Sequence, residues 1–185
     1  MNATLTSTLR VYDEQDGTKP LIDTTDRAEI ARILGAEKIL FERWEANAPL
    51  SAGAGQDEVL AGYAADVERL KSEFGYTTVD VIRVTPETPN VPALREKFLN
   101  EHTHTEDEVR FFVEGSASFY LRTGGKVYQA ICTRGDLMSI PANTTHWFDM
   151  GPTPEFAAIR LFVDPSGWVA NFTGDDIASR FPKYE

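Results

Sequence analysis

Cysteine is almost missing from this sequence: Cys132 is the single thiol among 185 residues. No disulfide can therefore form within the chain, which suits a reducing compartment such as the cytoplasm. Basic residues are also scarce, because 18 Lys and Arg stand against 29 Asp and Glu and leave a net charge of −11. Nucleic-acid binding usually requires charge of the opposite sign gathered in a patch, so we expect no nucleic-acid partner.

Long apolar runs are absent as well. No stretch approaches the ~20 residues that a membrane-spanning helix needs. The first residues, MNATLTSTLRVYDEQDG, lack the basic start and the apolar run of a signal peptide. We therefore expect no membrane association and a cytoplasmic location. The acidity and the lack of an evident apolar patch make a monomer the expected state.

The pattern of apolar residues changes along the chain. Up to about residue 100, strand-like runs alternate with helical segments, and from 102 to 164 only short strand-like runs remain. Gly, Pro, Asn and Asp separate these later runs at roughly hairpin spacing. The sequence thus predicts a mainly β fold with flanking helices, in which a mixed α/β flank precedes a compact antiparallel barrel or sandwich. The aromatic tail is expected to pack over the barrel.

Three helices are predicted in the first part of the chain. Asp26 and Glu29 have the spacing of a capping box at the start of the first helix. A single apolar stripe from Leu60 to Phe74 predicts one continuous helix over 57–75, with Gly75 as its cap. The third helix is short and is expected to begin at Pro92.

The sequence holds three histidines, and all of them fall in two short segments. His102 and His104 lie in EHTHTEDEVR, and His146 lies in IPANTTHWF. Imidazole is the commonest protein ligand for mid-transition metals, and residues two apart in a strand share a face. Glu108 follows His104 by four residues, and a bend between them would bring its carboxylate to the same metal; Glu106, the competing carboxylate, fits a solvated turn residue. The pattern predicts one metal site of three histidines and one carboxylate.

Four protein ligands out of a possible six leave two positions open. Structural zinc sites are usually closed and often contain thiolates, whereas Cys132 lies outside both histidine segments. Nitrogen and oxygen ligands with open positions suit Fe(II), Ni(II), Mn(II) or Co(II). The alternative is that these are ordinary core or surface histidines, which is the better interpretation of any one of them alone but not of the joint pattern.

The glycines and prolines around these ligands resemble the two motifs of the cupin superfamily. In the first motif, six residues separate Glu108 from Gly115, and the second motif contains Gly135, Pro141 and His146. Cupins usually have glycine at the position of Asn143 and often asparagine at that of Met150, but neither departure touches an expected ligand. The resemblance implies a single cupin domain over 1–185. Its jelly-roll barrel would span about 78–164, with an N-terminal α/β flank at 1–77 and a C-terminal tail at 165–185 packed on the barrel.

A narrower resemblance joins three segments of the chain. HTHTEDEVRFFVEG, DLMSIPANTTHWFDMG and GWVANFTGDDIASRFP together are very similar to bacterial acireductone dioxygenases of methionine salvage. The similarity is strong over about 80–182 and looser before that. It implies one Fe(II) or Ni(II) per chain, held by His102, His104, Glu108 and His146. The implied substrates are O2 and 1,2-dihydroxy-3-keto-5-methylthiopentene. The iron form would release formate and 4-methylthio-2-oxobutanoate, and the nickel form formate, carbon monoxide and 3-methylthiopropanoate.

Two arginines are candidates for contact with the anionic substrate. Arg110 lies two residues after Glu108 and shares its face in a regular strand. Arg160 lies within AAIRLF, where its apolar neighbours would face the opposite side. A buried guanidinium needs an anionic partner, and a bound enediolate would serve. The alternative for both is a structural ion pair with Asp or Glu.

Three aromatic residues, Phe98, Phe148 and Trp168, are candidates for an apolar wall around the methylthio tail. The alternative is that they belong to the core. Two other functions also remain open, because cupin sites host many reactions. One is another metal-dependent cupin enzyme, such as an isomerase or a different oxygenase. The other is a non-catalytic metal-binding or ligand-binding cupin.

Overall fold

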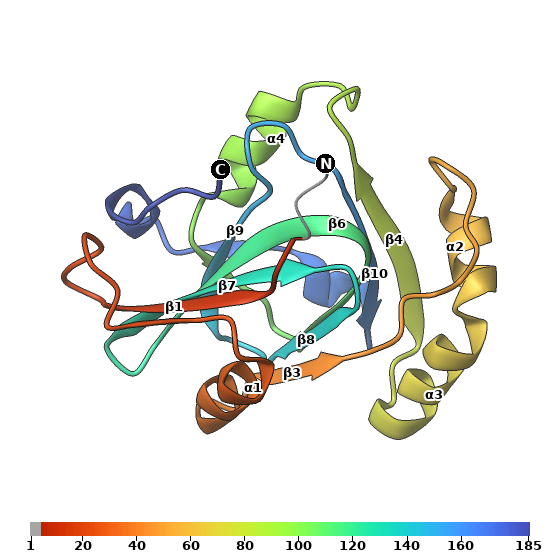
Figure 1. The fold of residues 1–185 in the computed structure, drawn as a ribbon, viewed down its shortest axis with the longest axis horizontal. Helices are drawn as coiled ribbons and strands as arrows, with labels where there is room; N and C mark the ends of the chain where they lie inside the picture. The colour runs from red at the N-terminus through yellow and green to blue at the C-terminus, as the bar shows by residue number, and fades with distance from the viewer. Residues whose placement is uncertain (1–4) are drawn as a thin grey trace.

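A computed structural model describes residues 5–185, in which two antiparallel sheets share one long strand, β6 (Glu108–Thr123) (Figure 1). The first sheet runs in the order β11 (Asn171–Phe172), β5 (His102–Thr103), β9 (Thr145–Asp149), β6, β7 (Lys126–Thr133), β1 (Thr8–Asp13) and β2 (Ile22–Thr24). The second runs β3 (Leu40–Arg43), β8 (Asp136–Ile140), β6, β10 (Phe156–Phe162) and β4 (Thr78–Val84). This mainly β, antiparallel architecture with flanking helices confirms the predicted fold class.

Strand β6 passes from one sheet to the other at Gly115. Up to this residue β6 pairs with β10, and from Ser116 onward it pairs with β7. Gly115 has a φ of +65°, and a Cβ placed there would lie only 1.7 Å from the carbonyl oxygen of Glu155. A glycine is therefore required where the strand turns the corner between the sheets.

The alternation of side chains along β6 builds two apolar layers. Phe112 faces the space between the sheets, where it packs with residues such as Phe119, Phe148 and Phe156. Val109 and Phe111 face the other way and pack under the helices α2 and α3. The same alternation turns Glu108 and Arg110 to the inner side, which is how a strand of the core delivers charged groups to a site.

Four α-helices lie around the sheets in the described part of the chain: α1 (Arg27–Ala36), α2 (Gln56–Gly62), α3 (Ala64–Phe74) and α4 (Val91–Phe98). As predicted, the Asp26 carboxylate caps α1 by accepting the Glu29 amide N–H, and Gly75 ends α3 with a φ of +76°. Figure 1 shows α2 and α3 on the outer side of β4. No helix within residues 5–185 combines the length and the apolarity needed to cross a membrane.

The prediction of one continuous helix over 57–75 is wrong. The helix is interrupted at Tyr63, whose backbone has a φ of −115° and a ψ of 22°. The Tyr63 ring packs edge-on against Phe111 at a centroid distance of 5.4 Å, and Gly62 lies against the segment around Leu50. Packing against the sheet thus outweighs the local preference for a straight helix. Phe74, expected on the buried stripe, is 51% exposed.

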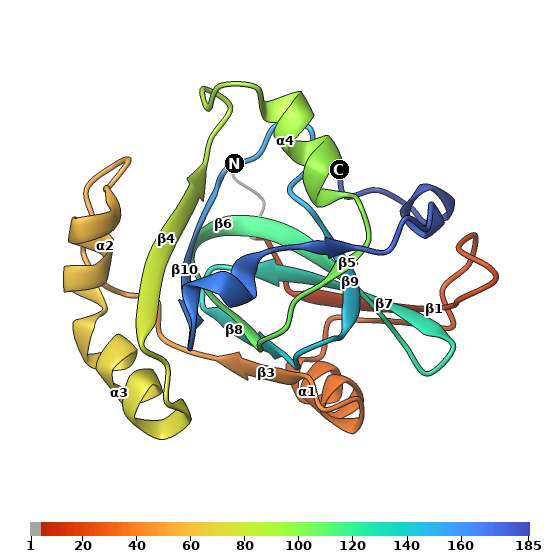
Figure 2. The ribbon, with the colours of Figure 1, turned by 180° about the vertical axis from the view of Figure 1, so that it is seen from behind.

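The last part of the chain runs along the first sheet, and its end packs on the outer face of this sheet. It contains the short 3-10 helices η1 (Pro165–Trp168) and η2 (Ile177–Arg180). Ile177 and Phe181 pack with Tyr12, Tyr120 and Trp147. Figure 2 shows this C-terminal segment running beside β5, with which β11 pairs. The pairing brings the tail next to the histidine strands.

Candidate metal centre

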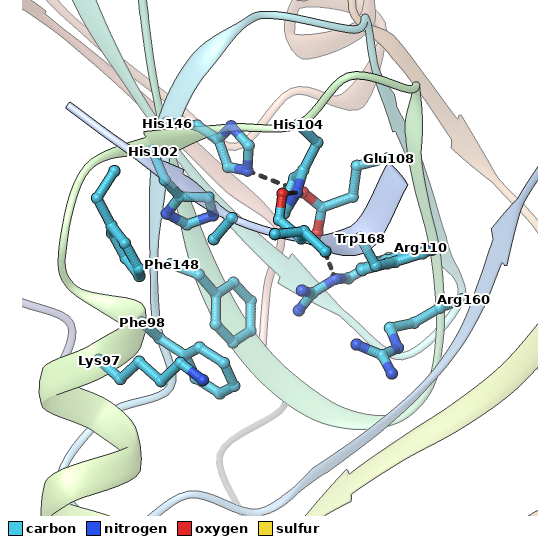
Figure 3. A pocket seen from close by; sticks show the side chains of 13 residues that line it. Lys97, Phe98, His102, His104, Glu108, Arg110, His146, Phe148, Arg160 and Trp168 are labelled. Carbon is cyan, nitrogen blue, oxygen red and sulfur yellow. Dashed lines mark hydrogen bonds and ion pairs between the residues drawn. The ribbon is translucent and has the colours of Figure 1, made fainter. Parts of the chain in front are cut away.

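Strands β5 and β9 bring the three histidines together. His102 and His146 are direct cross-strand partners, and His104 follows β5 in the loop to β6. One ring nitrogen of each histidine lies within 4.8 Å of those of the other two, a spacing that could hold a metal ion, and all three residues are buried. Figure 3 shows the three rings pointing toward Glu108. The two sequence segments therefore meet in one cluster.

A backbone carbonyl oxygen fixes the orientation of each imidazole. The Nδ1 atom of His102 lies 2.7 Å from the Asn100 oxygen, and that of His146 lies 2.8 Å from the Thr144 oxygen. The Nδ1 atom of His104 lies 3.3 Å from the oxygen of Val169. Because a carbonyl oxygen can only accept, each Nδ1 carries a proton, and in the neutral ring the Nε2 presents its lone pair to the cluster. Metal-binding histidines are held in this way by their second nitrogen.

The carboxylate of Glu108 completes the cluster. Its Oε2 atom lies 2.8 Å from the Nε2 of His146 and 3.5 Å from the Nε2 of His104. Glu108 is 3% exposed, and within the described residues neither of its oxygens, nor the Nε2 of His146, has a hydrogen-bond partner of good geometry. Buried oxygen and nitrogen lone pairs that face one another repel unless a cation lies between them. The donor set therefore fits a divalent metal that accepts nitrogen and oxygen ligands.

Burial of the histidines and the charge of Arg110 favour the protonation states that metal binding requires. Burial lowers the pKa of His102 to about 4, with a further contribution from the neighbouring His146, and it also lowers the pKa of His104. Burial raises the pKa of Glu108, but the charge of Arg110 outweighs it, so the carboxyl pKa lies below its usual range. Neutral imidazoles and an ionised carboxylate are the forms that metal binding requires.

The cluster lies at a pocket of about 440 Å³. Besides the histidines and Glu108, its lining includes every arginine and aromatic residue singled out from the sequence: Arg110, Arg160, Phe98, Phe148 and Trp168. Figure 3 shows Arg160 on the Arg110 side of the pocket and Phe98 on the side of helix α4. The structure therefore brings all of these predicted residues to one cavity.

The two arginines form a row with two carboxylates. Arg110 and Arg160 are cross-strand partners on β6 and β10, and Asp80 is opposite Arg160 on β4. The Nε of Arg110 lies 2.8 Å from Oε1 of Glu108, and the guanidinium of Arg160 makes two hydrogen bonds to the Asp80 carboxylate. The structural ion pairs named as the alternative are thus present for both arginines. Two neighbouring guanidinium groups on the wall of an open pocket still favour an anionic ligand.

The aromatic residues lie against these guanidinium groups. The Arg110 guanidinium lies 4.5 Å from the ring centroid of Phe148, and that of Arg160 lies 4.4 Å from the centroid of Trp168. Phe98 packs edge-on against Phe148 with the ring centroids 5.9 Å apart. Phe148 also belongs to the apolar core, which was the alternative interpretation of the three aromatic residues. The pocket therefore combines an apolar wall with a cationic one.

Sequence patterns did not single out several residues of the pocket. Lys97, Val169, Ala170 and Phe172 line it, and Asp80 holds Arg160. Lys97 lies one residue before Phe98 on α4, so the prediction of Phe98 could have drawn attention to it. Asp80 becomes recognisable only from the pairing of β4 with β10, which no local signal in the sequence gives.

A β-barrel with three imidazoles and one carboxylate at an open pocket is a metal-binding protein of the cupin class. A family model described as the ARD/ARD' family matches residues 8–170. The chain belongs to this family.

Relatives named acireductone dioxygenase match almost the whole chain. The protein of Parvibaculum lavamentivorans is 57% identical over 177 residues, which make up 96% of each chain. That of Pseudomonas aeruginosa PAO1 is 55% identical over 179 residues, or 97% of this chain and 99% of the relative. A solved structure, acireductone dioxygenase from Bacillus anthracis with a cadmium ion in its active centre, matches with a TM-score of 0.78 at 28% identity. The match covers 92% of this chain and 100% of the chain of the Bacillus anthracis protein. These findings confirm the resemblance that the sequence motifs indicated.

Proposed function

We propose that this protein is an acireductone dioxygenase of methionine salvage. The substrates are 1,2-dihydroxy-3-keto-5-methylthiopentene and O2. With Fe(II) the products are formate and 4-methylthio-2-oxobutanoate, and with Ni(II) they are formate, carbon monoxide and 3-methylthiopropanoate. One observation carries the proposal: a histidine–carboxylate cluster opens on a cationic and aromatic pocket, in a chain 57% identical to a relative of that name. Within the cupin class, this combination favours an enzyme over a storage or binding protein.

His102, His104, Glu108 and His146 would hold one Fe(II) or Ni(II). When bound, the metal would act as a Lewis acid toward the oxygens of the substrate. The chain prepares the site before metal binds, because carbonyl oxygens already orient the imidazoles. The low pKa of Glu108 keeps its carboxylate ionised at neutral pH. The four side chains thus need little rearrangement to bind the ion.

Arg110 and Arg160 bind and orient the substrate anion in this proposal. Both line the pocket and are cross-strand neighbours, so an anion between them would lower the repulsion of their charges. Arg110 has a second role, because its charge compensates the buried Glu108 before the metal arrives. Asp80 holds the guanidinium of Arg160 at two points and so limits its freedom at the pocket wall.

Phe98, Phe148 and Trp168 form the apolar wall for the methylthio tail. All three line the pocket, and Phe98 and Phe148 meet on the side of α4. An apolar tail held there would leave the polar head of the substrate facing the arginines and the histidines. These rings would also exclude water from the reacting carbons.

We further propose that the enzyme works as a cytoplasmic monomer. The single cysteine suits a reducing compartment, and the net charge of −11 opposes self-association.

The test is O2 consumption by the anaerobically prepared, iron-loaded protein after addition of acireductone. Because acireductones oxidise spontaneously, Fe(II) without protein and the iron-treated His104→Ala variant serve as controls. We expect consumption far above both controls, with formate and the keto acid in equal amounts. A rate equal to that of the protein-free control would contradict the proposed function. Turnover of a sugar phosphate or a flavonol instead would point to another cupin enzyme.

A further inference from the structure

The loop that carries His104 touches the segment that covers the pocket. We call residues 163–169 the cover segment. It contains η1, and its residues Trp168 and Val169 line the pocket. Hydrogen bonds connect the loop to both ends of the cover segment. The positions of the two parts are therefore coupled.

The first connection is made by Glu106. Its Oε2 atom accepts the backbone N–H of Val163 at 3.0 Å and that of Asp164 at 2.8 Å. Both amides lie immediately before η1, which begins at Pro165. Hydrogen bonds from backbone N–H groups to an ionised carboxylate are stronger than bonds between neutral groups. The expectation of a solvated turn residue is thus wrong for Glu106, which is half-buried and fastened to the cover segment.

Gly167 lets the two parts approach closely. A Cβ placed on Gly167 would lie 2.5 Å from Cγ of Glu106 and 2.7 Å from its Cδ. A side chain at this position would displace the Glu106 side chain or move the loop or the cover segment. The Glu106 side chain therefore packs against η1 and also accepts the hydrogen bonds from the amides of Val163 and Asp164.

The second connection lies at the metal cluster. The Val169 carbonyl oxygen accepts the Nδ1–H of His104 at 3.3 Å. The Trp168 ring lies 5.7 Å from the His104 ring and 4.4 Å from the Arg160 guanidinium, measured to ring centroids. The position of the cover segment therefore sets the orientation of His104.

We propose that Glu106 is a positioning residue of the metal centre. By holding the amides of Val163 and Asp164, it keeps the cover segment where the Val169 carbonyl orients His104 and Trp168 closes one side of the pocket. The inference rests on the metal site of the proposed function but not on the identity of the substrate.

The experiment combines two measurements that need no substrate. Hydrogen–deuterium exchange follows the amides of the cover segment, and the loss of Ni(II) to excess chelator follows the metal site. Glu106→Ala removes the acceptor, so we expect about tenfold faster exchange at Val163 and Asp164. The Val169 carbonyl, which orients His104, should become mobile in this variant. Ni(II) should therefore leave about tenfold faster. Glu106→Gln keeps a carbonyl acceptor but loses the charge, so both measurements should fall between those of wild type and those of Glu106→Ala.

Asp107 gives a matched control in the same loop. Its Oδ1 accepts the amide N–H of Ala142 at 2.8 Å and so holds the loop to a different segment. Asp107→Ala should leave the exchange of the cover segment and the loss of Ni(II) at wild-type levels. Equal effects of Asp107→Ala and Glu106→Ala would overturn the proposal, because general loosening of the loop would then explain both.

Gly167→Ala tests the same contact from the other side. The added methyl group should separate the cover segment from Glu106 and speed both exchange and Ni(II) loss. In the Glu106→Ala background only the contact with the Cβ of residue 106, at 2.9 Å, remains, so the same change should add less. This variant carries the test if Glu106→Ala does not fold. Wild-type exchange in Glu106→Ala would overturn the proposal, as would fast exchange with unchanged Ni(II) loss. Failure of the wild-type protein to bind Ni(II) would instead contradict the metal centre, and the exchange data would still test the contact.

Discussion

Replacing Arg110 by Met should destabilise the protein mainly when the metal is absent. The Arg110 side chain is 7% exposed, and its Nε lies 2.8 Å from the carboxylate of Glu108, which is 3% exposed. Without Arg110, Glu108 either stays charged in the interior or takes up a proton. Protonating a carboxyl of ordinary pKa at pH 7 costs about 3.7 kcal/mol, and breaking a buried ion pair typically costs about 3–5 kcal/mol. We therefore expect the apoprotein to lose about 3–4 kcal/mol of unfolding free energy.

A bound divalent cation beside Glu108 takes over the compensating charge. The loss in the Ni(II)-loaded protein should then fall to about 1–2 kcal/mol, which corresponds by linkage to Ni(II) binding roughly 30-fold tighter in Arg110→Met. Urea denaturation with and without Ni(II), together with calorimetric titration of Ni(II), measures both quantities. Arg160→Met is the control, because its partner Asp80 is 32% exposed and its loss should be small and independent of metal. Equal losses with and without Ni(II), or weaker Ni(II) binding by Arg110→Met, would refute this reasoning.

Two further predictions concern stability. Gly115→Ala should cost at least about 3 kcal/mol, because the methyl group would meet the Glu155 carbonyl oxygen, whereas Gly75→Ala, at a similar φ in open space, should cost about 1 kcal/mol. Equal losses in urea denaturation of the two variants would show that the corner of β6 does not need its glycine. In the apoprotein, His102 has a folded-state pKa of about 4 against an ordinary 6.5, so the unfolded chain binds the extra proton. Stability should therefore fall as pH drops from about 6.5 to about 4, by at most about 3 kcal/mol from this residue. A His102→Gln variant with the same slope over this range would contradict that assignment.

The ligand cluster could be predicted from sequence because its determinants are local. Two histidines at a spacing of two and a nearby glutamate already limit the geometry, and motif spacing placed His146 in the same barrel. The β fold was predictable for a similar reason, since strand alternation and turn residues are properties of short segments.

Features that depend on distant pairing were not predictable. Asp80 meets Arg160 only because β4 lies beside β10, and Glu106 meets the cover segment only because the chain returns some 57 residues later. The interruption at Tyr63 depends on the position of Phe111 in another layer. Local propensity cannot report such contacts, because they are set when the sheets and helices pack together.

Product analysis of the apoprotein, reconstituted separately with Fe(II) and with Ni(II) and given acireductone and O2, tests the proposed function most directly. We expect formate with 4-methylthio-2-oxobutanoate from the iron form, and formate with carbon monoxide and 3-methylthiopropanoate from the nickel form. Absence of any metal-dependent product in both samples would contradict the assignment as an acireductone dioxygenase and would leave only the cupin fold and its metal cluster.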